Sequence, residues 1–221
     1  MTFWKGAELG EGFRTRRRVL SGMVSATGVS AAALLGMNAV GPGAGAQVAT
    51  ANLSDELLDM ARFRNYKARR SSSWDRTGGN RDAVLIEPGA SATVLEVAGA
   101  GVVTHLWFTI SSPDPMHLKN LVLRAWWDGE SSPSVEAPIG DFFGLGLGEY
   151  FVYHSALLAV APVKALNAYF QMPFSSAARI TVSNEGSVRT GSLYYAVDYA
   201  ELPGLPSDVG RFHAQYRQAA P

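Results

Sequence analysis

Short apolar runs, separated by turn-forming residues, recur along the chain after residue 82. The runs are rich in Val, Ile, Leu, Thr and aromatic residues, which favour extended strands. Gly, Pro, Asn and Asp punctuate the runs, and no amphipathic helix of useful length separates them. The pattern predicts about eight strands, at residues 83–87, 91–97, 102–110, 120–127, 155–161, 166–172, 179–183 and 192–199.

Consecutive strands without crossover helices pair in antiparallel sheets, so the predicted fold class is all-β. Several connections, notably residues 129–153, are too long for a plain meander. We therefore expect an antiparallel jelly-roll sandwich.

A short helix is predicted before the strands. Ser54 is a suitable N-cap, and acidic residues and an apolar face follow it. The helix is expected to end in a basic cluster formed by Arg62, Arg64, Lys67, Arg69 and Arg70. Cations stabilise the C-terminal end of a helix dipole. We interpret the cluster as a solvated helix end rather than as a site for a polyanion.

The first 46 residues have the pattern of a targeting segment. Arg16 and Arg17 precede a moderately apolar stretch, as in a twin-arginine export signal, and residues 44–46 match a small-x-small cleavage pattern. The sequence thus divides into a signal (1–46), a linker with a helix (47–70) and a jelly-roll domain (71–221). We expect an exported protein, periplasmic or extracellular, without membrane contact after cleavage. An N-terminal transmembrane anchor remains the alternative.

Composition narrows the function classes. The formal net charge is zero, and the first 46 residues carry five of the 19 basic and two of the 19 acidic residues. The rest is slightly acidic, which argues against nucleic acid and anionic membranes as partners. The chain has no cysteine, so its fold depends on its core rather than on disulfides.

A polar, glycine-bearing stretch directly before the strands is the first candidate site. Within nine residues it contains Trp74, Asp75, Arg76, Asn80 and Asp82. Carboxylate, amide and guanidinium groups suit sugar hydroxyls, and an aromatic ring suits the C–H face of a sugar. The alternative is a structural turn in which Asp75 and Asn80 hydrogen-bond their own backbone.

A second candidate lies in the long connection, at residues 140–149. Its repeated glycines are not followed by the lysine of a phosphate-binding loop, so a nucleotide site is not expected. The glycines are instead typical of a loop that turns sharply beside a pocket. Asp141, with Phe142 next to it, is its candidate binding group.

Other chemistry receives less support. The four histidines lack metal-site spacing, so neither a metal nor another cofactor is predicted, and His105 is interpreted as a satisfied core histidine. Trp126 and Trp127 alternate faces of one strand, so one is expected in the core and the other as a sugar platform or subunit contact. Retaining glycosidases need two close carboxyl groups. Asp75 and Asp82 are instead expected to be held ionised by their neighbouring arginines.

Several segments together resemble a known family. They are residues 72–82, 103–110, 123–129, 133–144, 166–174 and 212–216. They resemble the bacterial proteins once grouped as domain of unknown function 2961 and later placed in glycoside hydrolase family 172. The resemblance implies a double jelly-roll protomer, commonly assembled into trimers and higher oligomers. It also implies action on fructofuranosides or arabinofuranosides with retention of configuration.

The chain departs from that family in one respect. The family's two catalytic glutamates lie in the second jelly roll, within motifs of the Trp-Trp-Gly-Glu-Gly and Gly-Thr-Glu-Asp-Tyr-Phe kind. Neither motif occurs in this sequence. It resembles a signal plus the first half of such an enzyme, so the resemblance assigns a catalytic role to no residue present.

Three functions remain open at this point. The first is the N-terminal jelly-roll half of an exported furanosidase, which binds a furanoside in a homo-oligomer such as a trimer and is incomplete for catalysis alone. The second is a non-catalytic carbohydrate-binding or oligomeric structural jelly-roll module. The third is a truncated remnant without activity.

Overall fold

The structure, a computed structural model, describes residues 61–219. The predicted signal, the alternative anchor and most of the predicted helix after Ser54 lie outside the described residues. Within residues 61–219, no helix has the length and apolar content that a membrane span requires.

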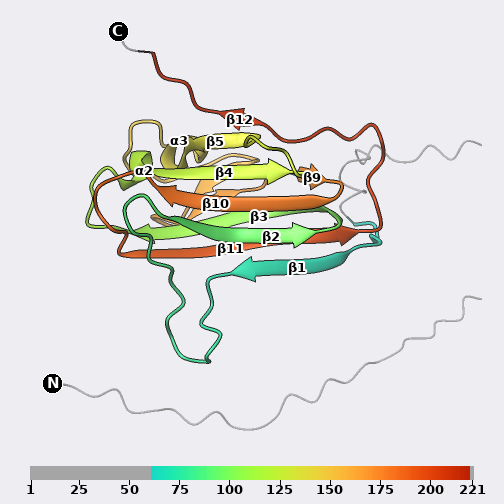
Figure 1. Cartoon of the computed structure of the whole chain (residues 1–221), viewed down its shortest axis with the longest axis horizontal. Helices are drawn as coiled ribbons and strands as arrows, with labels where there is room; N and C mark the ends of the chain where they lie inside the picture. Colours follow the sequence, from blue (N-terminus) through green and yellow to red (C-terminus); the bar gives the residue numbers. More distant parts are fainter. Residues whose placement is uncertain (1–60, 220–221) are drawn as a thin grey trace, which may run out of the picture. The chain divides into compact units, whose positions relative to one another are not determined.

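Strands dominate the described part, which contains only two one-turn helices besides them (Figure 1). The bounds are β1 Lys67–Ser72, β2 Ser91–Ala98, β3 Ala100–Ser111, α2 His117–Asn120, β4 Leu121–Trp127, β5 Val135–Pro138, α3 Ile139–Phe142, β6 Tyr153–His154, β7 Leu158–Val160, β8 Leu166–Ala168, β9 Met172–Phe174, β10 Ala177–Asn184, β11 Ser192–Leu202 and β12 Ala214–Gln215.

The strands form two sheets. A seven-stranded sheet has the order β1-β11-β3-β8-β7-β6, with β9 also paired to β3, and a five-stranded sheet has the order β12-β5-β4-β10-β2. All pairs are antiparallel except β12 with β5. Between β1 and β4, and again from β9 to β12, each strand lies in the opposite sheet from the one before it (Figure 1). This alternation gives the jelly-roll sandwich and confirms the predicted fold class.

The core lies between the sheets. Large apolar side chains from both, among them Phe108 of β3, Trp127 of β4 and Ile180 of β10, are fully buried. Trp127 points inward and its indole N–H donates to the Phe212 carbonyl at 2.8 Å. Trp126 is only partly buried and faces outward. The prediction that the two tryptophans divide between core and surface is therefore confirmed.

Residues 67–70 correct the predicted helix end. They belong to β1, which pairs along its whole length with β11. Arg69 Nε lies 3.0 Å from Glu201 and Arg70 Nε lies 2.5 Å from Asp198, and both acids are on β11. The basic residues thus form cross-strand ion pairs instead of capping a helix. The sequence signal was weak because β1 is an exposed edge strand without apolar alternation.

Residues 83–87 are a second correction. Only Val84 pairs, in an isolated bridge to Leu193, and no strand forms there. Ile86 is nevertheless buried, and its N–H donates to Thr190 Oγ1 at 2.7 Å. A side-chain hydroxyl therefore replaces the strand partner that the apolar pattern suggested.

Candidate functional site

Asp75 organises the first candidate loop from within. Its Oδ1 accepts hydrogen bonds from the Thr77 hydroxyl at 2.6 Å and the Thr77 N–H at 2.9 Å, and its Oδ2 accepts from the Arg81 N–H at 3.0 Å. Hydrogen bonds from the Thr77 hydroxyl, the Thr77 N–H and the Arg81 N–H hold the pKa of Asp75 below its usual value. Asp82 Oδ1 in turn accepts from the Asp75 N–H at 2.8 Å.

These contacts confirm that Asp75 hydrogen-bonds its own backbone and correct its predicted pairing with Arg76. The Arg76 guanidinium lies 5.2 Å from the centre of the Trp74 ring instead. Trp74, with 53% of its area exposed, Arg76 and Asn80 therefore lie at the surface, and Arg76 covers one face of the Trp74 ring.

The glycines of this loop have a structural reason. A Cβ on Gly79 would lie 2.6 Å from Asp75 Oδ2, and Gly78 has a φ of +79°. The tight wrap of backbone around the Asp75 carboxylate therefore requires residues without a side chain here.

The second candidate, Asp141 with Phe142, lies in α3 beside a cavity of about 280 Å³. Both oxygens of Asp141 lie 2.8 Å from Lys119 Nζ, which comes from α2. The lining residues are Ala137, Asp141, Phe142, Phe170, Phe212, Ala214, Gln215 and Tyr216.

Aromatic side chains from three segments form the wall of this cavity. Ring centres of Phe142 lie 6.4 Å from Phe170 and 6.3 Å from Phe212, and Phe170 and Phe212 are 5.0 Å apart. Gln215 and Tyr216 add an amide and a phenol. The cavity thus combines apolar ring surface with a few polar groups, as ligand sites do.

The cavity depends on a C-terminal strap, which we define as residues 209–217. Arg211 Nε lies 2.6 Å from Asp128 Oδ2, and the Tyr216 N–H donates to the Glu136 carbonyl at 3.0 Å. Between these contacts, β12 pairs with the edge of the five-stranded sheet at β5. The pattern of apolar residues did not predict β12, although residues 212–216 belong to the resemblance described above.

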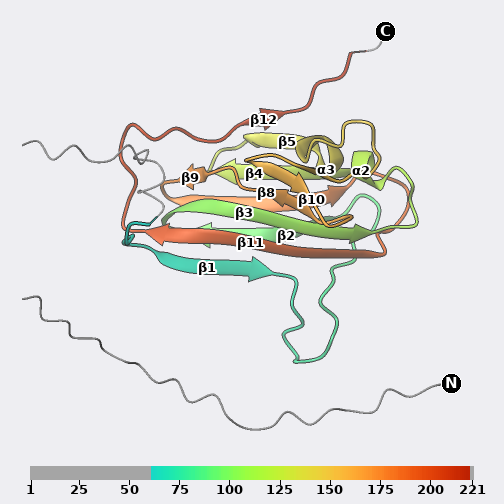
Figure 2. The ribbon, with the colours of Figure 1, turned by 180° about the vertical axis from the view of Figure 1, so that it is seen from behind.

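The structure does not bring the two candidate stretches together. The loop at residues 73–83 projects beyond β1, whereas α3 lies on the opposite side of the sandwich in both views (Figures 1 and 2). The cavity beside Asp141 contains no residue of the 74–82 loop. The two stretches are therefore two separate surfaces rather than one pocket.

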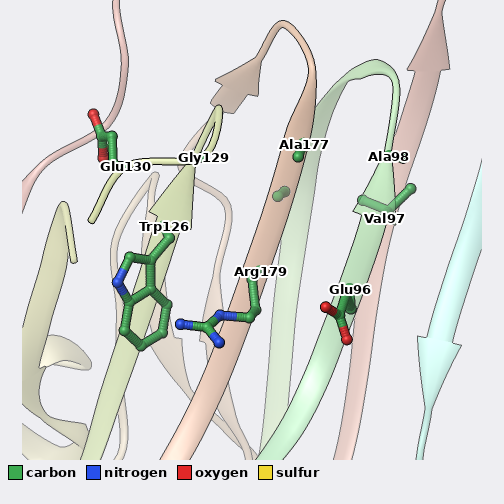
Figure 3. A pocket seen from close by; sticks show the side chains of 9 residues that line it. Glu96, Val97, Ala98, Trp126, Gly129, Glu130, Ala177 and Arg179 are labelled. Atoms are coloured by element: carbon green, nitrogen blue, oxygen red, sulfur yellow. The ribbon is translucent and has the colours of Figure 1, made fainter. Parts of the chain in front are cut away.

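Trp126 lines a third hollow, of about 410 Å³, on the outer face of the five-stranded sheet (Figure 3). The Arg179 guanidinium lies 4.1 Å from the centre of the Trp126 ring, and Glu96 is on the next strand. Because arginine already stacks on the indole, that ring face is not open to a sugar. This geometry does not favour Trp126 as a sugar platform.

His105 is a further correction, because it is not a core residue. It faces outward from the seven-stranded sheet with 23% of its side chain exposed. Its Nδ1 lies 3.3 Å from Asp198 Oδ2, its Nε2 lies 3.2 Å from Asn167 Oδ1, and its ring stacks on Tyr169 at 4.7 Å. The hydrogen bond from Arg70 lowers the pKa of Asp198, burial opposes it, and the hydrogen bond from His105 adds to the lowering.

Comparison with known proteins identifies the family. A model of the GH172 domain-like family matches residues 78–194, which is more than half of the chain. The chain belongs to the GH172 domain-like family. The match includes Asn80, Asp82, Asp141 and Phe142 but neither Trp74 nor the C-terminal strap. The family resemblance inferred from the sequence is thereby confirmed.

Solved structures with some likeness to this GH172 domain-like chain are viral. The cyanophage Pam1 capsid asymmetric unit shares 17% identity, covering 62% of this chain and 86% of the other, with a TM-score of 0.31. The structure of infectious bursal disease virus, Gx strain, shares 9% sequence identity and has a TM-score of 0.30. The likeness covers 62% of this chain and 33% of the viral chain. The crystal structure of the STIV MCP shares 10% sequence identity and has a TM-score of 0.28. The likeness covers 62% of this chain and 48% of the STIV MCP chain. This chain thus spans less than half the length of the last two. No curated protein matches it.

Among residues 61–219, no group of three or more His, Asp or Glu side chains is arranged to hold a metal ion.

Proposed function

We propose that this protein is the N-terminal jelly-roll half of an exported glycoside hydrolase and that it binds fructofuranosides or arabinofuranosides. The observation that carries the proposal is the cavity beneath the C-terminal strap, in a chain of the GH172 domain-like family. Its volume of about 280 Å³ lies near the lower end of the usual range for small-molecule pockets, which is about 300–1,000 Å³. A single sugar ring is a ligand of suitable size.

The lining groups suit a furanose. Phe170 and Phe212 offer apolar ring surface to the C–H groups of the sugar. Asp141 and the side-chain oxygen of Gln215 offer acceptors to its hydroxyls, whereas the Gln215 amide nitrogen already donates to the Pro133 and Ser134 carbonyls. A carboxylate has about four acceptor positions, so the pair with Lys119 leaves Asp141 able to accept further hydrogen bonds.

The loop around Asp75 belongs to the proposal as a second contact surface. Trp74, Arg76 and Asn80 are exposed there, while Asp75 and Asp82 hold the loop in shape. Because the loop and the cavity lie on opposite sides of the sandwich, the loop would contact a glycan independently of the cavity.

Binding without turnover is the expected behaviour of this chain alone. A retaining glycosidase needs one carboxyl group of raised pKa as its acid. In the described part of the chain, the carboxyl groups with a shifted pKa are Asp75, Asp128, Asp198 and Glu201, and in each the pKa is lowered. None of these four groups is therefore suited to act as the acid, and the second candidate function is a non-catalytic carbohydrate-binding module. Export, which the twin-arginine-like segment suggests, and homo-oligomer formation, which the family resemblance suggests, are also parts of the proposal.

Calorimetric titration of the purified protein tests the proposal. We expect methyl arabinofuranoside or methyl fructofuranoside to bind, and Asp141→Asn to weaken binding by roughly tenfold, because it removes a charged acceptor. Asp208→Asn, an exposed acid on the connection before the strap, is the matched control and should bind as the unaltered protein does.

Two outcomes contradict the proposal: no heat with either furanoside, or unchanged affinity in Asp141→Asn. Aryl furanosides, assayed in parallel, test whether this chain is catalytic by itself. Binding without turnover is the expected result, and turnover would contradict the proposal that this chain alone is incomplete for catalysis.

A further inference from the structure

A groove crosses three strands on the seven-stranded sheet. Ala68 of β1 pairs with Ala200 of β11, and Ala200 pairs with Val102 of β3. These three side chains form one cross-strand row in a groove of about 800 Å³. β1, β11 and β3 are neighbours in the sheet (Figure 1). Their register brings the three side chains of the row together.

Polar groups lie along one side of this row. A register shift between β11 and β3 falls between Asp198 and Tyr199, opposite Thr104, so that Thr104 and the adjacent His105 are both partly exposed. Such irregularities often re-aim side chains beside functional sites. The Thr104 hydroxyl donates to the Asp198 carbonyl at 3.2 Å, which leaves its oxygen free to accept.

Aromatic and amide groups complete the groove. Tyr66, with 49% of its area exposed, and Tyr199 supply ring surface. Gln171, exposed between β8 and β9, supplies an amide whose Nε2 donates to the Tyr169 carbonyl at 3.4 Å. The groove is thus suited to hydroxyl groups on a ligand with apolar faces.

The charges of the groove are already paired. Asp198 accepts two hydrogen bonds from Arg70, at 2.5 and 2.8 Å, and Arg69 is paired with Glu201. A charged ligand would have to compete with these ion pairs, whereas a neutral polyhydroxylated ligand can use their remaining acceptor positions. The groove is also nearly three times as large as the cavity beneath the strap.

We propose that this groove is a second carbohydrate site, which binds an oligosaccharide of two or more sugar residues across β1, β11 and β3. The inference rests on the proposed function, because it takes the ligand to be a carbohydrate. It adds a site that lies on the other sheet from β5 and β12, whose residues contribute to the cavity.

Paired variants test the groove by calorimetry with a furanosyl trisaccharide. Tyr66→Ala removes a ring of the groove, and Ala68→Trp fills its floor at an exposed strand position where an aromatic residue is tolerated. Tyr66→Ala should weaken trisaccharide binding by roughly tenfold or more, as loss of an aromatic anchor typically does. Ala68→Trp should weaken it by a similar factor, because the indole occupies the space of the ligand. Binding of methyl arabinofuranoside should stay unchanged.

Matched controls introduce the same residues, Ala and Trp, at positions outside the groove. Tyr194→Ala alters an exposed tyrosine of β11, and Thr93→Trp alters an exposed position of β2 on the other sheet. Both should bind the trisaccharide as the unaltered protein does, and thermal unfolding should show that all four variants fold.

The outcomes separate this inference from the proposed function. If both groove variants bind the trisaccharide normally, the groove is not a sugar site. Binding of the methyl furanoside would then still support the cavity as the sugar site. If the groove variants no longer bind the trisaccharide and the unaltered protein binds no methyl furanoside, the groove is supported as a sugar site and the proposed cavity site is contradicted. If no sugar binds the unaltered protein, both proposals are wrong.

Discussion

At the residue scale, the clearest lesson comes from acids whose partners are not their sequence neighbours. Asp75 was expected to pair with the adjacent Arg76, yet it binds Thr77 and the backbone of Arg81. Asp141 pairs with Lys119 from another helix. The sequence identified these acids as loop residues of chemical interest. Their partners depend on how the loop folds back, which local sequence rules do not specify.

Asp75→Ala tests the role of the loop. The substitution removes three hydrogen bonds, so the N–H groups of Thr77 and Arg81 should exchange with deuterium faster. The midpoint of thermal unfolding should stay within a few degrees, because the loop projects away from the core. Asp208→Ala is the control, and unchanged exchange in Asp75→Ala would show that the carboxylate does not hold the loop.

At the scale of elements, apolar alternation predicted the long strands well. The positions of β2, β3, β4, β10 and β11 were anticipated because each carries buried apolar residues along its length. Conversely, β1 is exposed and basic, and β12 has only two residues. Elements of that kind are determined by long-range pairing, so their own sequence contains little signal.

The turn after β4 shows how one side chain can join distant elements. Asp128, at a φ of +56°, accepts hydrogen bonds from the Ser175 and Ser176 N–H groups, both at 2.7 Å, and is paired with Arg211 of the strap. Burial raises the pKa of Asp128, but hydrogen bonds from Ser176, Arg211 and Ser175 outweigh it, so the pKa lies below its ordinary value of 3.8.

This lowered pKa predicts an acid-dependent contribution to stability. Because the folded pKa is below the unfolded one, the stabilisation is present above pH 3.8 and is lost as the pH falls through the folded pKa. Asp128→Asn should therefore lower the free energy of unfolding by about 2 kcal/mol at neutral pH. Urea unfolding at several pH values measures the difference, which should shrink in acid. A constant difference would contradict the assignment, and Asp208→Asn is the control.

At the scale of the whole molecule, the fold class and the family could be read from the sequence, whereas the arrangement of sites could not. Strand-like segments and the resemblance predicted a jelly-roll sandwich of this family. The cavity required the strap residue Phe212 to meet Phe142 and Phe170, and the groove required three strands in register. Both depend on contacts between residues far apart in the sequence, and only the assembled sandwich defines them.

The most direct test of the account is to locate furanoside binding on the molecule. Titration of the isotope-labelled protein with methyl arabinofuranoside, followed by NMR of the backbone amides, should shift signals of α3 and the C-terminal strap, including Asp141, Gln215 and Tyr216. Signals of the five-stranded sheet around Trp126 should not move. Shifts confined to that outer face, or no shifts at all, would contradict the proposed site.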